Sequence, residues 1–363
     1  MSNTTVRAVV GAAVVALVSA LGGCAMIACT GTASADTLSG IRFARATAAR
    51  PIIETATTPR NSVVSVWSAS MATQVPLLVQ SPSNGNALAP VVYMLNGSTG
   101  GEQGDDWTHA TDANVFFASK NVWTVTPIGG AASYYADWQH VDPAANFRFG
   151  VKSHRPLRWE TFLTSELPRT FETAHGGVTG VARARAIAGI SMSGTSVIRF
   201  AENHPGLYRA VGSYSGCADT ASASGNAIAR TVTFLPGGAD ASNMYGPPGS
   251  PEWAAQDPVI NAYKLARLTP ALWISAASGL AGSHDTPADP RVAGNLGTLA
   301  EQVTIGGIDE AAARACTVTL ARRLSDVGIP AHIRLPAAGT HSWGYWQDQM
   351  HQSWPVFAHA LGL

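Results

Sequence analysis

Charged residues are scarce in this chain of 363 residues. They make up only 13% of it, and 23 basic residues are balanced by 23 acidic ones, with no block rich in lysine and arginine. Nucleic acids and anionic membranes both attract a basic surface, so neither is expected as the main partner. Hydrophobic residues make up 46% of the chain, a content that excludes a disordered chain and predicts a large buried core.

The N-terminal apolar run is short for a membrane span. A basic residue precedes apolar residues over 8–21, fewer than the roughly 20 that cross a bilayer. The small residues Ala33-Ser34-Ala35 follow, which predicts a secretory signal peptide over 1–35 and a secreted or cell-envelope protein. The alternatives are a retained membrane anchor and a lipid-anchored form beginning at Cys24, where a weak lipoprotein box ends.

Cysteine is also rare, with four in the whole chain. Two of them would leave with the signal peptide, so that Cys217 and Cys316 remain. Outside the cell such a pair is more often bridged than free, and we expect a disulfide, with two buried thiols as the alternative. No group of cysteines and histidines has metal-ligand spacing, so the sequence predicts no metal and no other cofactor.

After an irregular lead-in expected over 36–61, the chain alternates between two kinds of segment. The strand-like runs are mostly continuous stretches of apolar residues, typical of strands buried on both faces: 63–67, 75–80, 91–95, 122–127, 184–190, 210–214, 271–276 and 333–336. The helix-like segments are 158–175, 193–204, 309–327 and 348–361. Long loops are expected over 236–251 and 278–307. This order predicts one α/β domain over 62–363, with a mostly parallel sheet covered by helices on both faces.

The sharpest motif is AGISMSGTS over 188–196. It follows a strand-like run and opens a helix-like one, which is the context of a nucleophile elbow, a sharp turn that exposes a serine hydroxyl. The elbow would present Ser191 between small neighbours, although Ser193 stands where the motif usually has a second glycine. Simple packing of a glycine-rich helix start is one alternative. Ser193 as the nucleophile is another, but it would already lie within the helix.

A serine hydroxyl needs a general base, and in this fold the order along the chain is serine, acid, histidine. His341 fits because it follows the last strand-like run near the end of the chain. The acid stays open between Asp309 and Glu310 at the expected start of a helix, where any acidic residue is favoured by the helix dipole. Asp285 and Asp289 are weaker possibilities.

Acyl transfer also needs two N–H groups that bind the oxyanion. The amide of Met192, directly after the nucleophile, is one expected donor. The other is expected from the glycine-rich loop over 96–101, which follows a strand-like run. A phosphate-binding loop is the competing interpretation, but the Lys-Ser/Thr ending of such a loop is missing.

Six ordered stretches make residues 63–363 resemble the antigen 85-type mycolyltransferases, which are secreted α/β hydrolases of the esterase D group from mycolic-acid bacteria. The stretches are PVVYMLNG from Pro90, PIGGAASYYADW from Pro127, RWETFLTSELP from Arg158, GISMSG from Gly189, MYGPPGSPEW from Met244 and GTHSWGYW from Gly339. The resemblance implies an α/β-hydrolase fold and a Ser–Glu–His triad. It maps the nucleophile to Ser191, the base to His341 and the acid to Glu310 rather than to Asp309.

The resemblance also implies a reaction and its partners. A mycolyl group would leave trehalose monomycolate for the serine and pass to a second trehalose monomycolate or to cell-wall arabinogalactan. The substrate is thus expected to be a glycolipid or another ester, and the acceptor a carbohydrate of the cell envelope. No nucleic acid, metal or cofactor is implied, and a monomer is expected.

The resemblance places the oxyanion amides at Ser98 and Met192. It places Ser342, Trp343 and Asn114 at the sugar site. Two departures concern the acceptor: Asn96 and Thr99 stand where the family has an Asp and an Arg that recognise trehalose. A third concerns the cysteines, because the family's pair before WETF is missing here. The expected 217–316 bridge would instead pin the acid-bearing helix beside the sheet.

These departures keep two other functions open. A secreted carboxylesterase with water as the acceptor would not need the sugar-recognising residues. A non-catalytic protein that binds the cell wall or a matrix is the second alternative, since the family includes members with degraded triads.

Overall fold

The computed structural model describes residues 37–38, 41–148, 155–177, 183–267 and 270–363. The expected signal peptide over 1–35 and the lipid-anchor alternative at Cys24 lie outside these residues. None of the helices in the described part of the chain is both long and apolar enough to span a bilayer.

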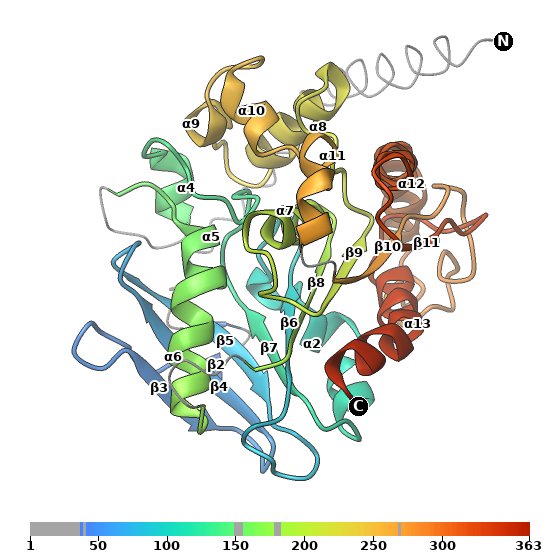
Figure 1. The fold of residues 1–363 in the computed structure, drawn as a ribbon. Helices are drawn as coiled ribbons and strands as arrows, with labels where there is room; N and C mark the ends of the chain where they lie inside the picture. The colour runs from blue at the N-terminus through green and yellow to red at the C-terminus, as the bar shows by residue number, and fades with distance from the viewer. Residues whose placement is uncertain (1–36, 39–40, 149–154, 178–182, 268–269) are drawn as a thin grey trace, which may run out of the picture.

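A nine-stranded sheet runs through the molecule (Figure 1), in the order β11-β10-β9-β8-β6-β7-β5-β4-β3. The strands from β11 to β7 in this order pair in parallel, whereas β5, β4 and β3 continue the sheet antiparallel. The mostly parallel sheet predicted from the sequence is therefore confirmed. Its strands are β3 Ile52–Ala56, β4 Asn61–Ser68, β5 Thr73–Gln80, β6 Val91–Leu95, β7 Trp123–Pro127, β8 Arg185–Ile190, β9 Ala210–Tyr214, β10 Ala271–Ser275 and β11 His332–Arg334; β1 Thr37–Leu38 and β2 Ile41–Arg42 form a separate pair.

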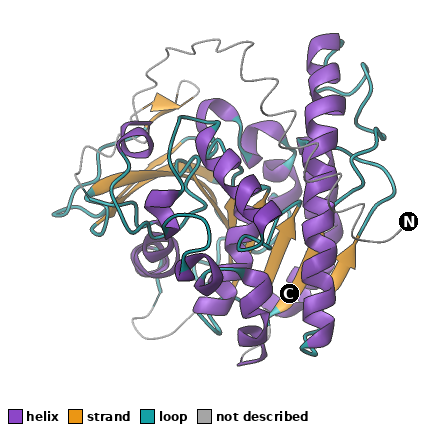
Figure 2. Cartoon of the chain, turned by 90° about the horizontal axis from the view of Figure 1, so that it is seen from above, coloured by secondary structure: helices purple, strands orange, loops and turns teal. Residues whose placement is uncertain are grey.

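Helices surround this sheet on both faces (Figures 1 and 2). They are α2 Trp107–Ala110, α3 Ala113–Phe117, α4 Pro143–Arg148, α5 Trp159–Thr161, α6 Leu167–Ala174, α7 Met192–Asn203, α8 Ala223–Phe234, α9 Ser242–Tyr245, α10 Pro251–Ala255, α11 Pro258–Asn261, α12 Leu296–Asp326 and α13 Trp343–Leu361. Short helical turns of other types are η1 Glu102–Gly104, η2 Phe162–Glu166 and η3 Ala262–Arg267. In Figure 2, α12 is the long straight helix at one side of the molecule.

Successive residues of the central strands enter two different cores. Tyr93 and Leu95 of β6 join a cluster that includes residues of α5, α6, α7 and α12. Val92 and Met94, which alternate with these two residues along β6, join a second cluster with α2, α3 and α13. Side chains of a strand alternate between the faces of a sheet, so a strand buried on both faces must be apolar throughout. This is why continuous apolar runs identified the strands.

Helix α12 begins earlier than the sequence suggested, and the expected loop over 278–307 is wrong in its second half. Asn295 caps the helix, since its side chain accepts hydrogen bonds from the amides of residues 297 and 298. Gly306 and Gly307 lie inside the helix because another segment packs against it there. A methyl group added to Gly307 would lie 2.7 Å from the carbonyl oxygen of Gly279. Glu310 is consequently a residue of the helix interior rather than of its first turn.

Two other boundaries differ from the sequence analysis. Strand β3 lies within the segment expected to be an irregular lead-in over 36–61, and it pairs with β4 at the edge of the sheet. Its mostly exposed side chains gave no apolar run to detect. The last helix, α13, starts at Trp343 rather than at residue 348.

The expected disulfide between Cys217 and Cys316 is present. Cys217 follows β9 and Cys316 lies on α12. The Cys217 backbone is also held by α7, since the Thr195 hydroxyl donates to its carbonyl oxygen at 2.9 Å and accepts from its amide at 3.1 Å. The bridge therefore joins the segment after β9, which Thr195 of α7 holds by hydrogen bonds, to the helix that carries Glu310.

We expect the double variant Cys217→Ser/Cys316→Ser to lose about 2–5 kcal/mol of unfolding free energy, because the bridge closes a long loop in the unfolded chain. The bridged residues are 99 positions apart. Guanidinium denaturation of the variant and of the oxidised and reduced parent protein measures this. Equal unfolding free energies in all three would contradict the prediction.

Candidate active site

Ser191 sits in the sharp turn between β8 and α7, with the strained backbone of a nucleophile elbow. Its φ of 52° and ψ of −120° lie in a region that residues with a side chain rarely adopt. Its amide donates to the carbonyl oxygen of Tyr214 on β9 at 2.9 Å. A methyl group on Gly189 would lie 2.5 Å from the Ser193 carbonyl oxygen, and one on Gly194 3.0 Å from that of Tyr214. The small neighbours are thus required by close backbone packing.

Ser193 has a structural position. Its side chain is fully buried. The hydroxyl accepts a hydrogen bond from the Ile190 amide at 2.9 Å and lies within donating distance of the carbonyl oxygens of Ile190 and Leu95. These contacts tie the start of α7 to the ends of β8 and β6.

Glu310 and His341 form a close pair. The distance between Glu310 Oε2 and His341 Nδ1 is 2.8 Å, and the carboxylate is almost fully buried. Its other oxygen accepts from the Ser215 hydroxyl at 2.9 Å and from the Ala277 amide at 2.6 Å. Asp309, the other acid considered, has an exposed side chain. Of the two acidic residues, the structure brings Glu310 to the histidine.

The environment of His341 shifts its pKa and sets its orientation. Burial alone would lower the pKa of His341, but the hydrogen bond to Glu310 and the negative charges of Glu310 and Asp309 raise that pKa above its ordinary value. A ring that donates from Nδ1 to a carboxylate leaves Nε2 as its proton acceptor. The His341 amide donates to the Gly306 carbonyl oxygen at 2.9 Å, which fixes the backbone against α12.

Contacts at the carboxyl edge of the sheet connect Ser191 to this pair. Tyr214, which accepts from the Ser191 amide, is followed directly by Ser215, which donates to Glu310. Trp346 donates from its indole to Ser215 Oγ at 3.0 Å, and its ring meets the His341 ring edge-on at 5.0 Å. Parallel strands end at one edge of a sheet, so residues that follow β8, β9 and β10 meet there.

The segments that carry the two expected oxyanion donors lie beside Ser191. A methyl group on Gly97 would lie 3.7 Å from the Ser191 Cβ atom, which places the loop after β6 against Ser191. The carbonyl oxygen of Ser98 accepts from the Ala132 amide at 2.9 Å, and this bond orients the Ser98 backbone. Met192 is the first residue of α7, where an amide has no partner within its own helix.

A strained loop over 131–135 supports this arrangement, and the sequence analysis gave it no role. Ala132, Tyr134 and Tyr135 have φ values of 58°, 51° and 46°. From α7, Arg199 donates to the carbonyl oxygens of both tyrosines at 3.1 Å, and Ser196 donates to that of Tyr134 at 2.6 Å. The sequence contained one indication of this role, because Arg199 is a basic residue in a helix that was otherwise expected to pack on the sheet.

Arg199 is itself fully buried, and its guanidinium is paired with Glu160 at 2.9 Å. Breaking a buried pair of this kind by removing one partner is strongly destabilising. The strained loop is therefore held by a well-anchored group.

An acidic residue that the sequence analysis missed, Asp105, connects two of the expected sugar-site residues. It accepts from the Trp343 indole at 2.5 Å and from the Thr99 hydroxyl at 2.7 Å. The Trp343 ring packs edge-on against Trp107 and Trp346. Ser342 is the residue that precedes α13, beside Trp343. Thr99 and Trp343 thus share one partner, and Ser342 and Trp343 directly follow His341 in the chain.

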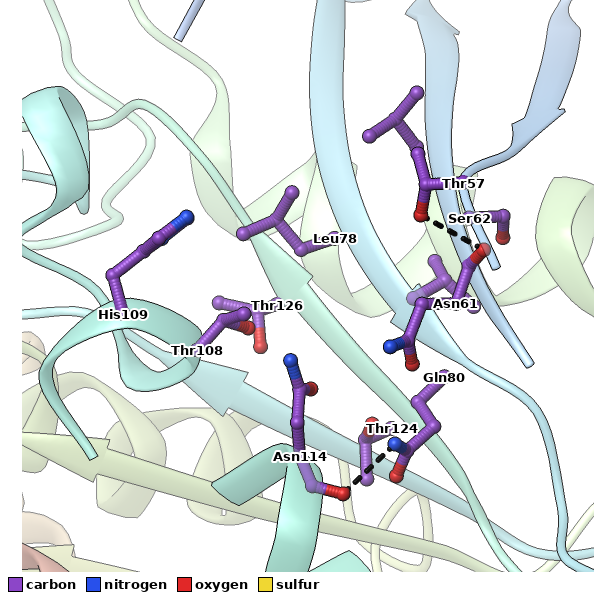
Figure 3. Close-up of a pocket in the computed structure, with 12 residues that line it drawn as sticks. Thr57, Asn61, Ser62, Leu78, Gln80, Thr108, His109, Asn114, Thr124 and Thr126 are labelled. Carbon is purple, nitrogen blue, oxygen red and sulfur yellow. Dashed lines mark hydrogen bonds between the residues drawn. The ribbon is translucent and has the colours of Figure 1, made fainter. Parts of the chain in front are cut away.

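The other two expected sugar-site residues lie elsewhere. The Asn96 side chain is fully buried and donates to the Pro127 carbonyl oxygen at 2.9 Å, so it braces the loop from inside. Asn114, on α3, lines a separate cavity of about 100 Å³ beside strands β4, β5 and β7 (Figure 3). Its carbonyl oxygen accepts from Gln80 at 2.9 Å. The side-chain directions of these asparagines could not be read from the sequence.

Comparison with known proteins finds esterases and acyltransferases among the relatives of this chain. A family model described as a putative esterase matches residues 68–357. The diacylglycerol acyltransferase/mycolyltransferase Ag85A of Mycobacterium tuberculosis (strain ATCC 25618 / H37Rv) is 30% identical, with 98% of this chain and 92% of the relative covered. Ag85B of Mycobacterium intracellulare is 31% identical, with 82% of each covered. The chain belongs to the antigen 85-type esterase family.

Solved structures show the fold of this antigen 85-type chain. MPT51 (FbpC1) of Mycobacterium tuberculosis matches with a TM-score of 0.64 and 24% identity, covering 81% of this chain and 96% of MPT51. An S-formylglutathione hydrolase from Agrobacterium tumefaciens matches with a TM-score of 0.54 and 14% identity, covering 84% and 97%. The predicted α/β-hydrolase fold is confirmed.

The strain at Ser191 gives a stability prediction for this antigen 85-type chain. Ser191→Gly and Ser191→Ala both remove the hydroxyl, but only glycine adopts a positive φ without strain. We expect the free energy of unfolding of the glycine variant to exceed that of the alanine variant by about 1 kcal/mol. The reason is that relief of backbone strain in the folded state outweighs the greater entropy of glycine in the unfolded state. Denaturant titration of the two variants measures the difference. A glycine variant less stable than the alanine one would show that the turn is unstrained.

Proposed function

We propose that this protein is a serine acyltransferase in which Ser191, His341 and Glu310 form a catalytic triad. The observation that carries the proposal is the buried pair of Glu310 and His341 at the same sheet edge as a strained serine. Membership of an esterase family supports it. The pair orients an imidazole base, and the elbow presents a hydroxyl.

The proposed reaction has two steps. In the first, Ser191 Oγ attacks the ester carbonyl carbon while His341 Nε2 takes the hydroxyl proton, and Glu310 stabilises the imidazolium. The amides of Ser98 and Met192 bind the oxyanion. The tetrahedral intermediate collapses, and the leaving alcohol departs with the proton from His341. In the second step an acceptor hydroxyl repeats the sequence on the acyl-enzyme and regenerates Ser191.

For the substrate, we propose a mycolyl ester of trehalose, with a sugar hydroxyl of a second such ester or of cell-wall arabinogalactan as acceptor. The relatives are named as mycolyltransferases and diacylglycerol acyltransferases, which supports this choice. Transfer requires that water is kept from the acyl-enzyme, and the clustered rings of Trp343 and Trp346 beside His341 suit that role. We further propose that the protein acts as a secreted monomer at the cell envelope.

A carboxylesterase with water as acceptor remains the second proposal, because a specific observation favours it. The two positions where the family carries its trehalose-recognising Asp and Arg hold Asn96 and Thr99. Asn96 is buried against Pro127, and the Thr99 hydroxyl is bonded to Asp105. The Asn96 side chain is turned into the protein and the Thr99 hydroxyl already donates to Asp105, so neither reproduces the charged recognition of trehalose that an Asp and an Arg supply.

Incubation with radiolabelled trehalose monomycolate and thin-layer separation distinguishes the two proposals. Transfer yields dimycolate, whereas hydrolysis yields only free mycolate. We expect dimycolate from the parent protein and a loss of about 10³-fold or more with Ser191→Ala, because the nucleophile is gone. Ser224→Ala, at an exposed serine of α8, is the matched control. Activity that survives Ser191→Ala would refute the triad.

The pH dependence of the rate tests whether Glu310 is the triad acid. Neutral His341 is the active form, so the rate should rise with pH as the ring loses its proton. The carboxylate raises the pKa of His341, so Glu310→Gln should move this rise to lower pH. The same change should reduce kcat by about 10⁴-fold through loss of orientation. Asp309→Asn should move this increase in rate to lower pH by a smaller amount and should keep most of kcat. Equal losses in both variants would contradict the assignment of Glu310.

A further inference from the structure

Asp285, which the sequence analysis considered only as a weak alternative for the triad acid, accepts hydrogen bonds from four groups. Its Oδ1 accepts from the Gln302 amide at 2.6 Å and from the Thr340 hydroxyl at 2.7 Å. Its Oδ2 accepts from the Tyr345 hydroxyl at 2.6 Å and from the Gly282 amide at 2.7 Å. The carboxylate does not contact His341 in any of these bonds, so it is not part of the triad.

Three of the four donors lie on or beside the elements that carry the proposed base and acid. Thr340 is the residue directly before His341, and its side chain is fully buried. Gln302 lies on α12, the helix of Glu310, and Tyr345 lies in the first turn of α13. One carboxylate therefore connects the loop after β11, which carries His341, to α12 and to α13.

Backbone bonds join the same two loops. The Gly279 amide donates to the Gly339 carbonyl oxygen at 2.8 Å, and the Gly339 amide donates to that of Leu280 at 2.7 Å. These bonds align the loop after β10 with the loop after β11, up to residue 339. The next residue, Thr340, holds the loop that carries His341 through its side chain, which donates to Asp285.

We propose that Asp285 is a positioning residue, which holds Thr340 and thereby sets the His341 ring against Glu310. The proposal rests on the proposed function in which His341 is the general base. Catalytic groups displaced by about 1 Å can lose about 10²-fold in rate, so a residue one step removed from the base can control turnover without touching the substrate.

A carboxylate is suited to this position because it only accepts hydrogen bonds, and all four partners donate. An asparagine has the same shape, but its NH₂ group would face two donors. Burial alone would raise the pKa of Asp285, but the bonds from Tyr345, Gln302, Thr340 and Gly282 lower that pKa below its ordinary value. The group is therefore ionised wherever neutral His341 is present.

The same loop offers a matched control. Asp289 is bonded to His284 at 2.9 Å, and the other nitrogen of that ring is 2.9 Å from Asp348 of α13. Asp289 also accepts from the Arg291 amide at 2.9 Å. These bonds secure the loop without contacting Thr340 or Asp285. Asp289→Asn thus disturbs the loop after β10 but leaves the hydrogen bond between Thr340 and Asp285 in place.

The experiment compares Asp285→Asn with Asp289→Asn in the full-length mature protein. One readout is steady-state turnover of a p-nitrophenyl ester. The other, independent of catalysis, is the nitrogen NMR spectrum of protein labelled in histidine, where the His341 Nδ1 proton shared with Glu310 is identified by its loss in His341→Ala. We expect Asp285→Asn to lower kcat by about 10–100-fold with KM changed less than threefold, and to broaden the His341 signal. Asp289→Asn should change neither.

A second pair of variants keeps the proposal testable if Asp285→Asn does not fold. Thr340→Ser keeps the hydroxyl donor and should retain kcat, whereas Thr340→Val removes it and should behave like Asp285→Asn. An unchanged kcat and an unchanged His341 signal in Asp285→Asn, or in Thr340→Val, would overturn the positioning role. An ordered His341 signal in a parent protein that turns over no ester would instead overturn the proposed function alone.

Discussion

The hydrogen bond between Glu310 and His341 is the contact on which the rest of the site depends. It joins residues from a long helix and from a loop near the end of the chain, and it forms only because both reach the carboxyl edge of the sheet. There, Ser215 and Ala277 hold the carboxylate from the ends of β9 and β10. Because the carboxylate is buried and accepts three bonds, it has a single orientation, and it imposes that orientation on the ring.

Strain and its support are arranged around this pair. Ser191 and the three residues of the 131–135 loop have positive φ values, a conformation that costs of order 1–3 kcal/mol each. Arg199 and Ser196 of α7 hold the loop, and the loop in turn holds the Ser98 carbonyl. The helix that follows Ser191 therefore also fixes, through this loop, the segment that carries the Ser98 amide, the proposed oxyanion donor. The disulfide joins α12 to the segment after β9, and Thr195 of α7 holds that segment by two hydrogen bonds.

Much of the architecture could be predicted from the sequence because the signals are local. Continuous apolar runs gave the strands, and a strand–turn–helix context with small residues gave the sharp turn at Ser191. Chain order selected His341, which the structure pairs with Glu310. The start of α12 was predicted too late because Gly306 and Gly307 were assigned to the loop before the helix, whereas they lie inside it and allow Gly279 to pack closely. Local sequence does not distinguish a glycine that precedes a helix from one inside it that admits a neighbour.

What could not be predicted depends on side chains that meet across the fold. Asp105, Arg199 and Asp285 are ordinary polar residues in the sequence, and each acquires a role only from partners more than a few positions away. Asn96 and Asn114 show the reverse, since residues expected at a sugar site turn inward or lie at another cavity.

The most direct test is a crystal structure of the protein after reaction with a fluorophosphonate, which mimics the tetrahedral intermediate. The account predicts a single adduct on Ser191 Oγ. Its phosphoryl oxygen should accept from the amides of Ser98 and Met192, and His341 Nε2 should lie within hydrogen-bond distance of Ser191 Oγ. An adduct on another serine, or one whose phosphoryl oxygen points into solvent away from both amides, would contradict it.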